Sequence, residues 1–208
     1  MKKINLELWD RKDHYLFYLN MDIPQYTLTF EVEITPLIHY IKKNGFPFYL
    51  SMIYFVMKTT QQIEAFRYRI WENEVVLFDR VHPSFTDMES QSSLFKIVSV
   101  DMEEPLETFI QSAQNHAQNQ TEFIDLSKEK RQDWVFITSF PWARYTSLTN
   151  AMNIDPKDAI PRISWGRFTE QNGRITLPLT LGVHHGFVDG YHISLWLNAF
   201  DQMLKNLK

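Results

Sequence analysis

Hydrophobic and polar residues alternate along several short stretches of the chain, and this pattern predicts strands. In the clearest stretch, 26–34, aromatic and aliphatic residues alternate with threonine and glutamate. Successive strand side chains point to opposite faces, so alternation indicates a strand with one face toward solvent. Further strands are predicted at 66–71, 75–78, 85–88, 95–100, 134–140, 162–168 and 174–183.

Apolar residues recur at helical spacing in four other segments, which are predicted to be helices. The first, at 35–44, starts with Thr35-Pro36 and ends before Gly45, residues that favour a helix start and a helix end. Strands and helices are mixed without strict strand–helix–strand alternation. We therefore expect an α+β fold, a mostly antiparallel mixed sheet with helices on one face. The other helices are predicted at 49–63, 103–118 and 191–207.

The composition narrows the class of protein. The chain has 208 residues, 44% of them hydrophobic, and no linker divides it, so we expect a single domain over 1–208. The net charge of -4 provides no basic patch, which argues against a nucleic-acid partner. The absence of cysteine excludes disulfides and thiol catalysis. With no signal peptide and no apolar segment long enough to span a bilayer, we expect a cytoplasmic protein without a membrane partner.

The segment between the last predicted strand and the last predicted helix carries the pattern HHxxxDG. His184 and His185 are followed by Asp189 and Gly190. Only one of two neighbouring strand residues can face a given cleft, and Asp189 is well placed to cap the helix. Three histidines and an aspartate within nine residues suggest a metal site as an alternative. The opposite faces of His184 and His185 argue against it, and we expect no metal.

Six further segments carry motifs in a fixed order along the chain. They are WDRKDHY at 9–15, FY at 48–49, FRYR at 66–69, VHPSFT at 81–86, PW followed by TS within 141–147, and ISWGRF at 163–168. Together with HHxxxDG they resemble, nearly end to end, the trimeric type of chloramphenicol acetyltransferase, a CoA-dependent acyltransferase. The resemblance implies transfer of the acetyl group of acetyl-CoA to a hydroxyl of chloramphenicol, which inactivates the antibiotic. It also implies a homotrimer with the acceptor site between subunits.

The resemblance implies a catalytic role for five residues. His185 matches the general base that removes the proton of the acceptor hydroxyl, a task that suits imidazole because it titrates near neutrality. Ser147 matches the hydroxyl that donates a hydrogen bond to the oxyanion of the tetrahedral intermediate. Asp189 matches an aspartate that pairs with the arginine at Arg11 and holds the site together. Ser164 replaces a threonine that positions a water.

Four other residues are implied in binding. Tyr18 lies where the family places a tyrosine against the acceptor, and we expect His185 and Tyr18 to come from neighbouring subunits. Tyr49 and Phe168 match aromatic residues near coenzyme A, and ordinary packing is the alternative role for both. Arg162 lies on the strand face of the water-positioning serine, where the family usually has an apolar residue in the acceptor pocket.

Three departures from the family pattern concern the signature and the acceptor pocket. The middle of HHxxxDG reads Gly-Phe-Val where the family usually has Ala-Val-Cys, and segment 87–93 is shorter than its counterpart. The third departure is Arg162, a cation that would disfavour a neutral aryl group unless it points away or finds a partner. Asp87 and Glu89 are the expected partners.

Three functional hypotheses follow. The leading one is acetyl transfer to chloramphenicol, the second is acetyl transfer to another small hydroxyl or amine, and the third is a catalytically silent trimeric binding protein. The presence of His185, Asp189, Arg11 and Ser147 argues against the third. Two relatives with the same signature fit less well. A dihydrolipoyl acyltransferase core normally follows a lipoyl domain, and a condensation domain of peptide synthetases holds two such halves in one chain.

Overall fold

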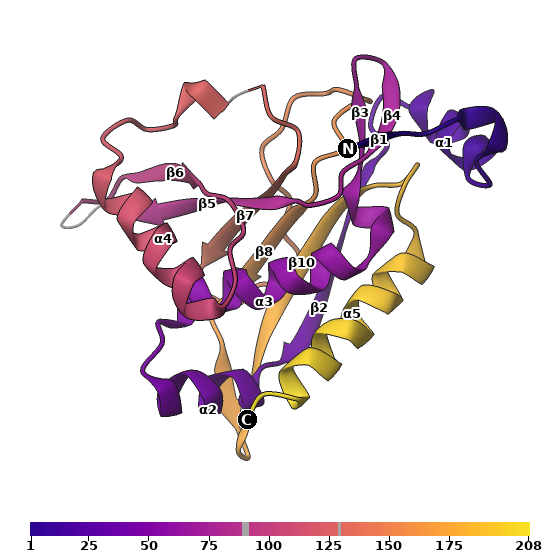
Figure 1. Cartoon of the computed structure of the whole chain (residues 1–208). Helices are drawn as coiled ribbons and strands as arrows, with labels where there is room; N and C mark the ends of the chain where they lie inside the picture. Colours follow the sequence, from indigo (N-terminus) through magenta and orange to yellow (C-terminus); the bar gives the residue numbers. More distant parts are fainter. Residues whose placement is uncertain (89–91, 129) are drawn as a thin grey trace.

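A seven-stranded mixed sheet forms the centre of the protein, seen in a computed structural model that describes residues 1–88, 92–128 and 130–208 (Figure 1). Its strands are β2 (Gln25–Glu33), β5 (His82–Met88), β6 (Phe95–Ser99), β7 (Trp134–Phe140), β8 (Arg162–Gly166), β9 (Thr169–Gln171) and β10 (Arg174–His184). They run in the order β2-β10-β8-β7-β5-β6, and β9 also pairs with β10. Four of these pairs are antiparallel, whereas β7 is parallel to both of its neighbours. The predicted mostly antiparallel mixed sheet is confirmed.

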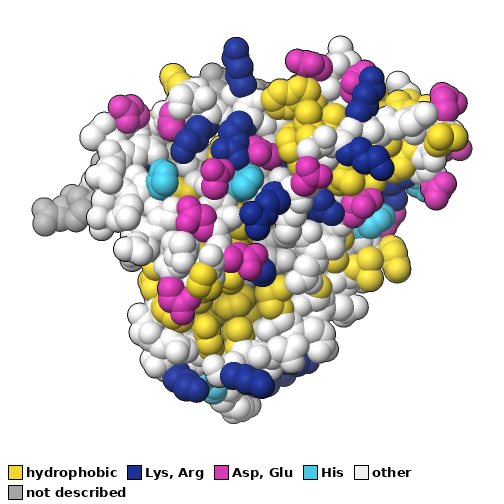
Figure 2. All heavy atoms as spheres, in the orientation of Figure 1, with side chains coloured by type: hydrophobic (Ala, Val, Ile, Leu, Met, Phe, Trp, Pro, Cys, Tyr) yellow, Lys and Arg dark blue, Asp and Glu magenta, His cyan; other side chains and the backbone are white. Residues whose placement is uncertain are grey.

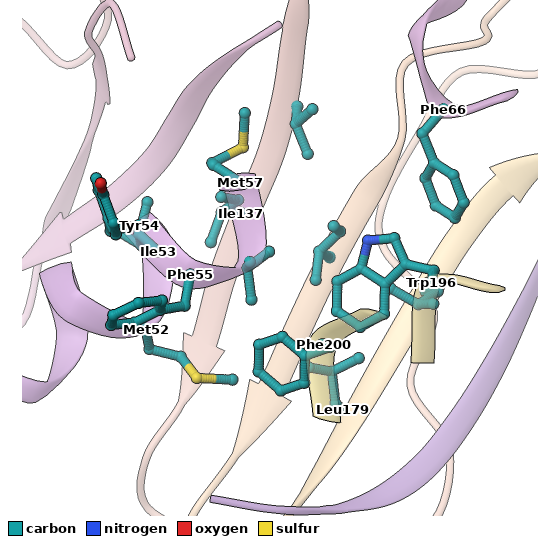
Figure 3. Packing of buried hydrophobic residues seen from close by; sticks show 14 of the residues in the cluster. Met52, Ile53, Tyr54, Phe55, Met57, Phe66, Ile137, Leu179, Trp196 and Phe200 are labelled. Atoms are coloured by element: carbon teal, nitrogen blue, oxygen red, sulfur yellow. The ribbon is translucent and has the colours of Figure 1, made fainter. Parts of the chain in front are cut away.

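Helices cover one face of this sheet, as predicted (Figure 1). They are α2 (Thr35–Asn44), α3 (Phe48–Gln62), α4 (Leu106–Asn119) and α5 (Gly190–Lys205). Helix α3 contacts the other three and is the most deeply buried of them. Trp196 and Phe200 of α5 stack with ring centroids 5.1 Å apart and pack toward Leu179 of β10 (Figure 3). Burial of such large side chains is the main contribution that stabilises the helices on the sheet.

A smaller sheet and a short helix lie beside the N-terminal segment, at the upper right of Figure 1. The sheet has the order β1-β4-β3, formed by β1 (Lys2–Lys3), β4 (Glu74–Leu77) and β3 (Tyr68–Trp71). The helix is α1 (Lys12–Leu19), and the sequence pattern did not predict it because only Tyr15 of its 8 residues is buried. A helix without an apolar stripe gives no periodic signal. Three short 3₁₀ turns complete the described elements: η1 (Leu6–Leu8), η2 (Glu64–Arg67) and η3 (Leu126–Lys128).

The predicted boundaries of the elements agree closely with the structure where punctuating residues mark them. Helix α2 begins with Thr35 and Pro36 and ends at Gly45, which has a left-handed φ of 72°. The helix predicted from 103 starts later, at Leu106, because Pro105 lacks a backbone N–H and stands at the helix N-cap.

The helix-covered face carries charges of both signs. Figure 2 shows Lys and Arg side chains interspersed with Asp and Glu over the upper part of this face. Within residues 1–88, 92–128 and 130–208, no helix combines the length and the apolar character that crossing a membrane requires.

Candidate active site

The HHxxxDG segment connects the last strand to the last helix. Strand β10 ends at His184, and α5 begins directly after Asp189. The Asp189 carboxylate accepts hydrogen bonds from the backbone N–H groups of Tyr191 (3.0 Å) and His192 (3.4 Å). It also lies 2.9 Å from Nδ1 of the His192 ring. The predicted N-cap is therefore present, and α5 holds one end of the segment.

Arg11 holds the same segment from the N-terminal part of the chain. Its guanidinium pairs with Asp189 at 2.8 Å and donates to the carbonyl oxygens of Gly186 (2.8 Å) and His185 (3.2 Å). Partial burial acts to raise the pKa of Asp189, but the Arg11 hydrogen bond and the nearby positive charges outweigh it and bring this pKa down to about 2. The predicted ion pair between Arg11 and Asp189 is thus present in the structure.

The two adjacent histidines have different environments, as the alternation of strand faces predicts. The His184 ring is buried, with Nε2 2.9 Å from the Pro156 carbonyl oxygen and Nδ1 accepting the Gly186 N–H at 3.0 Å. These partners assign the ring proton to Nε2, and burial lowers the pKa of His184. His184 is therefore a neutral residue that ties β10 to the segment before β8. Among the residues the structure describes, no group of three or more His, Asp or Glu is arranged to hold a metal ion.

The His185 imidazole contacts two tyrosine rings. Tyr18 stacks on it with ring centroids 4.0 Å apart and an interplanar angle of 8°, and Tyr26 lies 4.5 Å away at a tilt. The Tyr18 hydroxyl is 3.2 Å from Nε2, whereas Nδ1 is buried and has no hydrogen-bond partner within the described ranges. The prediction that Tyr18 and His185 come from neighbouring subunits is therefore wrong, because Tyr18 on α1 contacts His185, directly after β10, within one chain.

Phe187 packs the middle of the signature segment against the N-terminal part of the protein. Its ring stacks on those of Tyr15 and Tyr68, at 5.5 and 5.7 Å, and lies 5.1 Å from the His184 ring. The preceding Gly186 leaves no room for a side chain, since a Cβ there would lie 2.8 Å from Cε1 of His184. The Gly and Phe of the Gly-Phe-Val sequence therefore pack around the same ring: Phe187 contacts His184, and the glycine leaves room for it.

Hydroxyl side chains form a row across the sheet on the face opposite the helices. Strand register sets Thr180 beside Ser164 and Ser164 beside Thr138, and the Thr138 hydroxyl lies 3.2 Å from that of Thr86. Intervening strand residues such as Ile137 point into the core toward the helices (Figure 3). Ser164 therefore occupies the middle of this row.

A cavity of about 510 Å³ opens where the N-terminus of α3 meets β5, β7 and β8. Tyr49 and Phe168 both line it, and Phe168 meets Phe48 edge to face at 5.4 Å. The Tyr49 hydroxyl donates to the Thr86 carbonyl oxygen at 2.6 Å, and burial raises the pKa of this tyrosine. Aromatic side chains supply six of the 14 residues that line it. We refer to this space as the donor cavity.

A second cavity, of about 430 Å³, lies on the helix-free face and is lined by Arg162, Asn150 and several apolar residues. It shares Thr86, Phe95 and Thr138 with the donor cavity, so the two spaces adjoin at the Thr86–Thr138 hydroxyl pair. We refer to this second space as the acceptor cavity.

Arg162 forms an ion pair, but with a carboxylate other than the two that were expected. Its guanidinium pairs with Asp158 at 2.6 Å and donates to the Ile160 carbonyl oxygen at 3.1 Å. Asp87 lines the donor cavity instead, so its predicted pairing is wrong. The other expected partner, Glu89, lies outside the described residues, as do residues 90 and 91 of the short segment. Asp158 is closer in the chain than either, and its loop folds back over the start of β8.

All of the predicted site residues except Ser147 form two groups within one chain. Ser164 pairs with Thr180, and His185 lies five positions beyond Thr180, which is roughly 16 Å at about 3.3 Å per residue. Ser147 is exposed in the irregular segment after β7. One group holds His185, Asp189, Arg11 and Tyr18, and the other lies at the cavities and holds Ser164, Arg162, Tyr49 and Phe168.

Comparison with known proteins identifies the family of the chain. The chloramphenicol acetyltransferase family matches residues 1–201. The chain belongs to this family. The chloramphenicol acetyltransferase of Staphylococcus intermedius is 28% identical over 207 residues, which cover 98% of this chain and 96% of that protein. A solved chloramphenicol acetyltransferase structure, 26% identical, superimposes with a TM-score of 0.88 over 98% of this chain and 99% of its own.

The fold is shared more widely than the family. The cubic core of the pyruvate dehydrogenase multienzyme complex superimposes with a TM-score of 0.62 at 15% identity, over 99% of this chain and 92% of its own. That likeness shows the fold of CoA-dependent acyltransferases alone. Family membership makes this protein a chloramphenicol acetyltransferase-like acyltransferase, and the family uses acetyl-CoA.

Sequence reasoning missed three residues that the structure places at the two groups. Tyr26 lies against His185, Asp158 pairs with Arg162, and Asn150 donates to the Ser164 hydroxyl at 3.4 Å. The strand that starts near Tyr26 was predicted, but only its pairing with β10 places the ring beside the imidazole. Asp158 and Asn150 both lie in irregular segments, where no periodic pattern gave a signal.

Proposed function

We propose that this protein transfers the acetyl group of acetyl-CoA to a hydroxyl of chloramphenicol. Nε2 of His185 takes the proton of the acceptor hydroxyl, whose oxygen attacks the thioester carbonyl carbon. Ser147 donates a hydrogen bond to the resulting oxyanion, and Ser164 positions a water beside it. Collapse of the tetrahedral intermediate breaks the carbon–sulfur bond, and the thiolate of coenzyme A takes the proton from the imidazolium.

The observation that carries this proposal is that the donor and acceptor cavities adjoin at Thr86 and Thr138. Direct transfer needs the thioester and the acceptor hydroxyl bound together, with reacting atoms about 3–3.5 Å apart. The donor cavity offers the aromatic walls of Tyr49 and Phe168 to coenzyme A. The acceptor cavity, under the hydroxyl row, offers space for a small alcohol.

The surroundings of His185 suit a general base. The Tyr18 hydroxyl lies 3.2 Å from Nε2 in a ring stacked on the imidazole, so it does not occupy the in-plane lone pair with which Nε2 would accept the proton of an acceptor hydroxyl. Stacking on Tyr18 fixes the ring plane, and the Arg11 bond to the His185 carbonyl oxygen fixes the backbone. The ion pair of Arg11 with Asp189 acts on the base through this support and takes no part in proton transfer.

We infer a homotrimer of single-domain subunits, in which His185 of one subunit completes the cavities of the next. Support comes from the separation of roughly 16 Å along β10 between the base and the Ser164 row, because no hydrogen bond spans that distance. When one surface of a subunit binds a different surface of an identical subunit, the contact repeats head to tail and can close into a ring.

A coupled assay tests the proposal. The purified protein is given acetyl-CoA and chloramphenicol, and released thiol is measured together with the mass of the acetylated product. The same assay without acceptor measures thioester hydrolysis, and a panel of other small alcohols and amines measures acceptor choice. Thiol release that needs chloramphenicol supports the proposal. Release only with another acceptor overturns the chloramphenicol assignment, and no release with any acceptor overturns acetyl transfer.

A further inference from the structure

The acceptor cavity has one charged wall. The side chains of Arg162 and Asp158 are 13% and 18% exposed and form an ion pair. Arg162 lines the cavity together with residues such as Phe95, Ile97 and Phe136. The guanidinium carbon lies 5.4 Å from the centre of the Phe136 ring, so the cation rests over an aromatic face. The cavity therefore combines an apolar body with a cationic end.

Asn150 adds a second polar group to the same space. Its amide nitrogen donates to the Ser164 hydroxyl at 3.4 Å, and its buried Oδ1 has no hydrogen-bond partner among the residues that the structure describes. A buried amide oxygen without a partner is costly unless a ligand or water satisfies it. Asn150 lines the cavity together with Arg162, so a bound molecule could reach both.

Arg162 keeps hydrogen-bonding capacity for a ligand, although its charge is balanced. The guanidinium has five N–H groups, and Asp158 and the Ile160 carbonyl oxygen are its hydrogen-bond acceptors within the described ranges. Since Asp158 already neutralises the cation, a carboxylate on the acceptor would place a second negative charge beside it. A neutral hydrogen-bond acceptor, such as an amide or another carbonyl, avoids that repulsion.

The strand spacing sets where such a group must lie on the acceptor. Arg162 and Ser164 are two positions apart on β8 and point to the same face. Two strand positions span about 7 Å, close to the length of a six-membered ring with one substituent. If the reacting hydroxyl lies at the level of Ser164, a polar group about 7 Å away along the molecule lies at the level of Arg162.

We propose that the acceptor is an alcohol with an apolar body and a neutral amide-like group at its far end, whose carbonyl oxygen accepts from Arg162 and whose N–H donates to Oδ1 of Asn150. This inference rests on the proposed function, because it assigns the substrate class of the same site. Arg162 is then a specificity-determining residue.

The chain offers a control that distinguishes binding of the acceptor by Arg162 from anchoring of the segment that contains Asp158. The segment that contains Asp158 is also anchored by Gln25, whose amide nitrogen donates to the carbonyl oxygens of Asp155 and Asp158, both at 2.8 Å. Gln25 does not line the acceptor cavity. The variant Gln25→Leu therefore loosens the same segment without altering the cavity wall, and it serves as the matched control.

The experiment compares two acceptors of equal shape and unequal polarity. Both are chloramphenicol analogues with the same propanediol end, one with a carboxamide in place of the nitro group and one with an isopropyl group there. We expect wild type to favour the carboxamide in kcat/KM by at least about tenfold, the size of a hydrogen bond to a charged donor. Arg162→Leu is expected to abolish or reverse this preference, and Gln25→Leu to keep it within about twofold. The double variant Arg162→Leu/Asp158→Leu, which leaves no unpaired carboxylate, should behave as Arg162→Leu does.

Each outcome decides between the two proposals. A wild type that acetylates both analogues without preference, or a preference that Arg162→Leu leaves intact, overturns the polar end of the acceptor site and leaves the proposed function standing. An equal loss of preference in Gln25→Leu assigns Arg162 to loop anchoring and likewise overturns this inference. No acetylation of any alcohol by wild type overturns both.

Discussion

Tyr18 and His185 stack face to face in one chain, with ring centroids 4.0 Å apart. Tyr18 lies on α1, and Arg11, at the N-cap of the same helix, binds the His185 carbonyl oxygen. One short helix therefore supplies both the ring that orients the imidazole and the cation that fixes its backbone. Because the base depends on α1, the proposed site unites this N-terminal helix with a strand end more than 150 positions later in the chain.

Replacing His185 with alanine is expected to remove nearly all turnover while folding and coenzyme A binding survive. The loss of a general base costs roughly 10²–10⁴-fold in rate, and the donor cavity lies elsewhere in the chain. Steady-state kinetics and calorimetric titration with coenzyme A measure the two effects. A variant that keeps a tenth of wild-type activity would contradict the assignment. His184→Ala provides the comparison. The His184 ring faces Pro156, so its removal is expected to lower the stability of the fold more than the catalytic rate.

Mixed trimers test which residues share a subunit. Thr138→Phe fills the junction of the two cavities, and His185→Ala removes the base, so each pure trimer is expected to be inactive. When equal amounts of the two variants are unfolded together and refolded, about a quarter of the sites should regain activity. At these sites one subunit supplies an intact His185 and its neighbour supplies intact cavities.

The matched control mixes His185→Ala with Tyr18→Ala. Both changes affect the same half-site, because the two rings stack within one chain. No activity above that of Tyr18→Ala alone is expected. Light scattering of each mixture shows whether trimers have formed. Recovery in this second mixture, or none in the first, would contradict a site shared between neighbours in this way.

The sequence revealed the elements that carry a periodic signal and missed those that lack one. Strand alternation and punctuating residues placed the sheet and α2, because burial of one face imposes that pattern directly. Helix α1 escaped because only Tyr15 is buried there. The assignment of Tyr18 and His185 to neighbouring subunits came from the family resemblance instead, and the structure places both rings together in one chain.

The polar contacts of the site were predictable only where a motif linked them. Arg11 and Asp189 came from the family resemblance and do pair. The partner of Arg162 was sought in segment 87–93, on a neighbouring strand, whereas the structure finds it in the loop before β8. Strand order and loop path depend on long-range packing, which single-sequence patterns do not encode.

The pair of Arg11 and Asp189 is expected to behave as a unit in a double-mutant cycle. Breaking a buried ion pair costs roughly 3–5 kcal/mol, and the cost here is expected to be lower because the Asp189 side chain is 30% exposed. Urea unfolding of Arg11→Ala, Asp189→Asn and the double variant measures the coupling. Asn keeps the helix cap, so the cycle reports the charge pair. We expect the double variant to be little less stable than the worse single one, and strictly additive losses would contradict the pairing.

The stability of the protein is expected to fall on acidification through His184. Burial lowers the pKa of this residue in the folded state, and its Nδ1 already accepts the Gly186 N–H, so a proton there would oppose another donor. The unfolded chain binds a proton at about pH 6.5. The stability contributed by neutral His184 is thus complete above that pH and declines as the pH falls toward the lower folded-state pKa.

The variant His184→Gln isolates this effect, because a glutamine amide can still donate toward Pro156 but does not titrate. We expect it to be less stable than wild type at pH 8 by about 1–3 kcal/mol, the cost of leaving the buried Gly186 N–H without its acceptor. The difference should narrow as the pH falls below about 6.5, because only wild type loses the His184 contribution. Other histidines with a lowered pKa, such as His82, are present in both proteins and cancel. Urea unfolding at pH 8, 7, 6 and 5 measures the difference, and a constant value across this range would show that His184 does not couple folding to protonation.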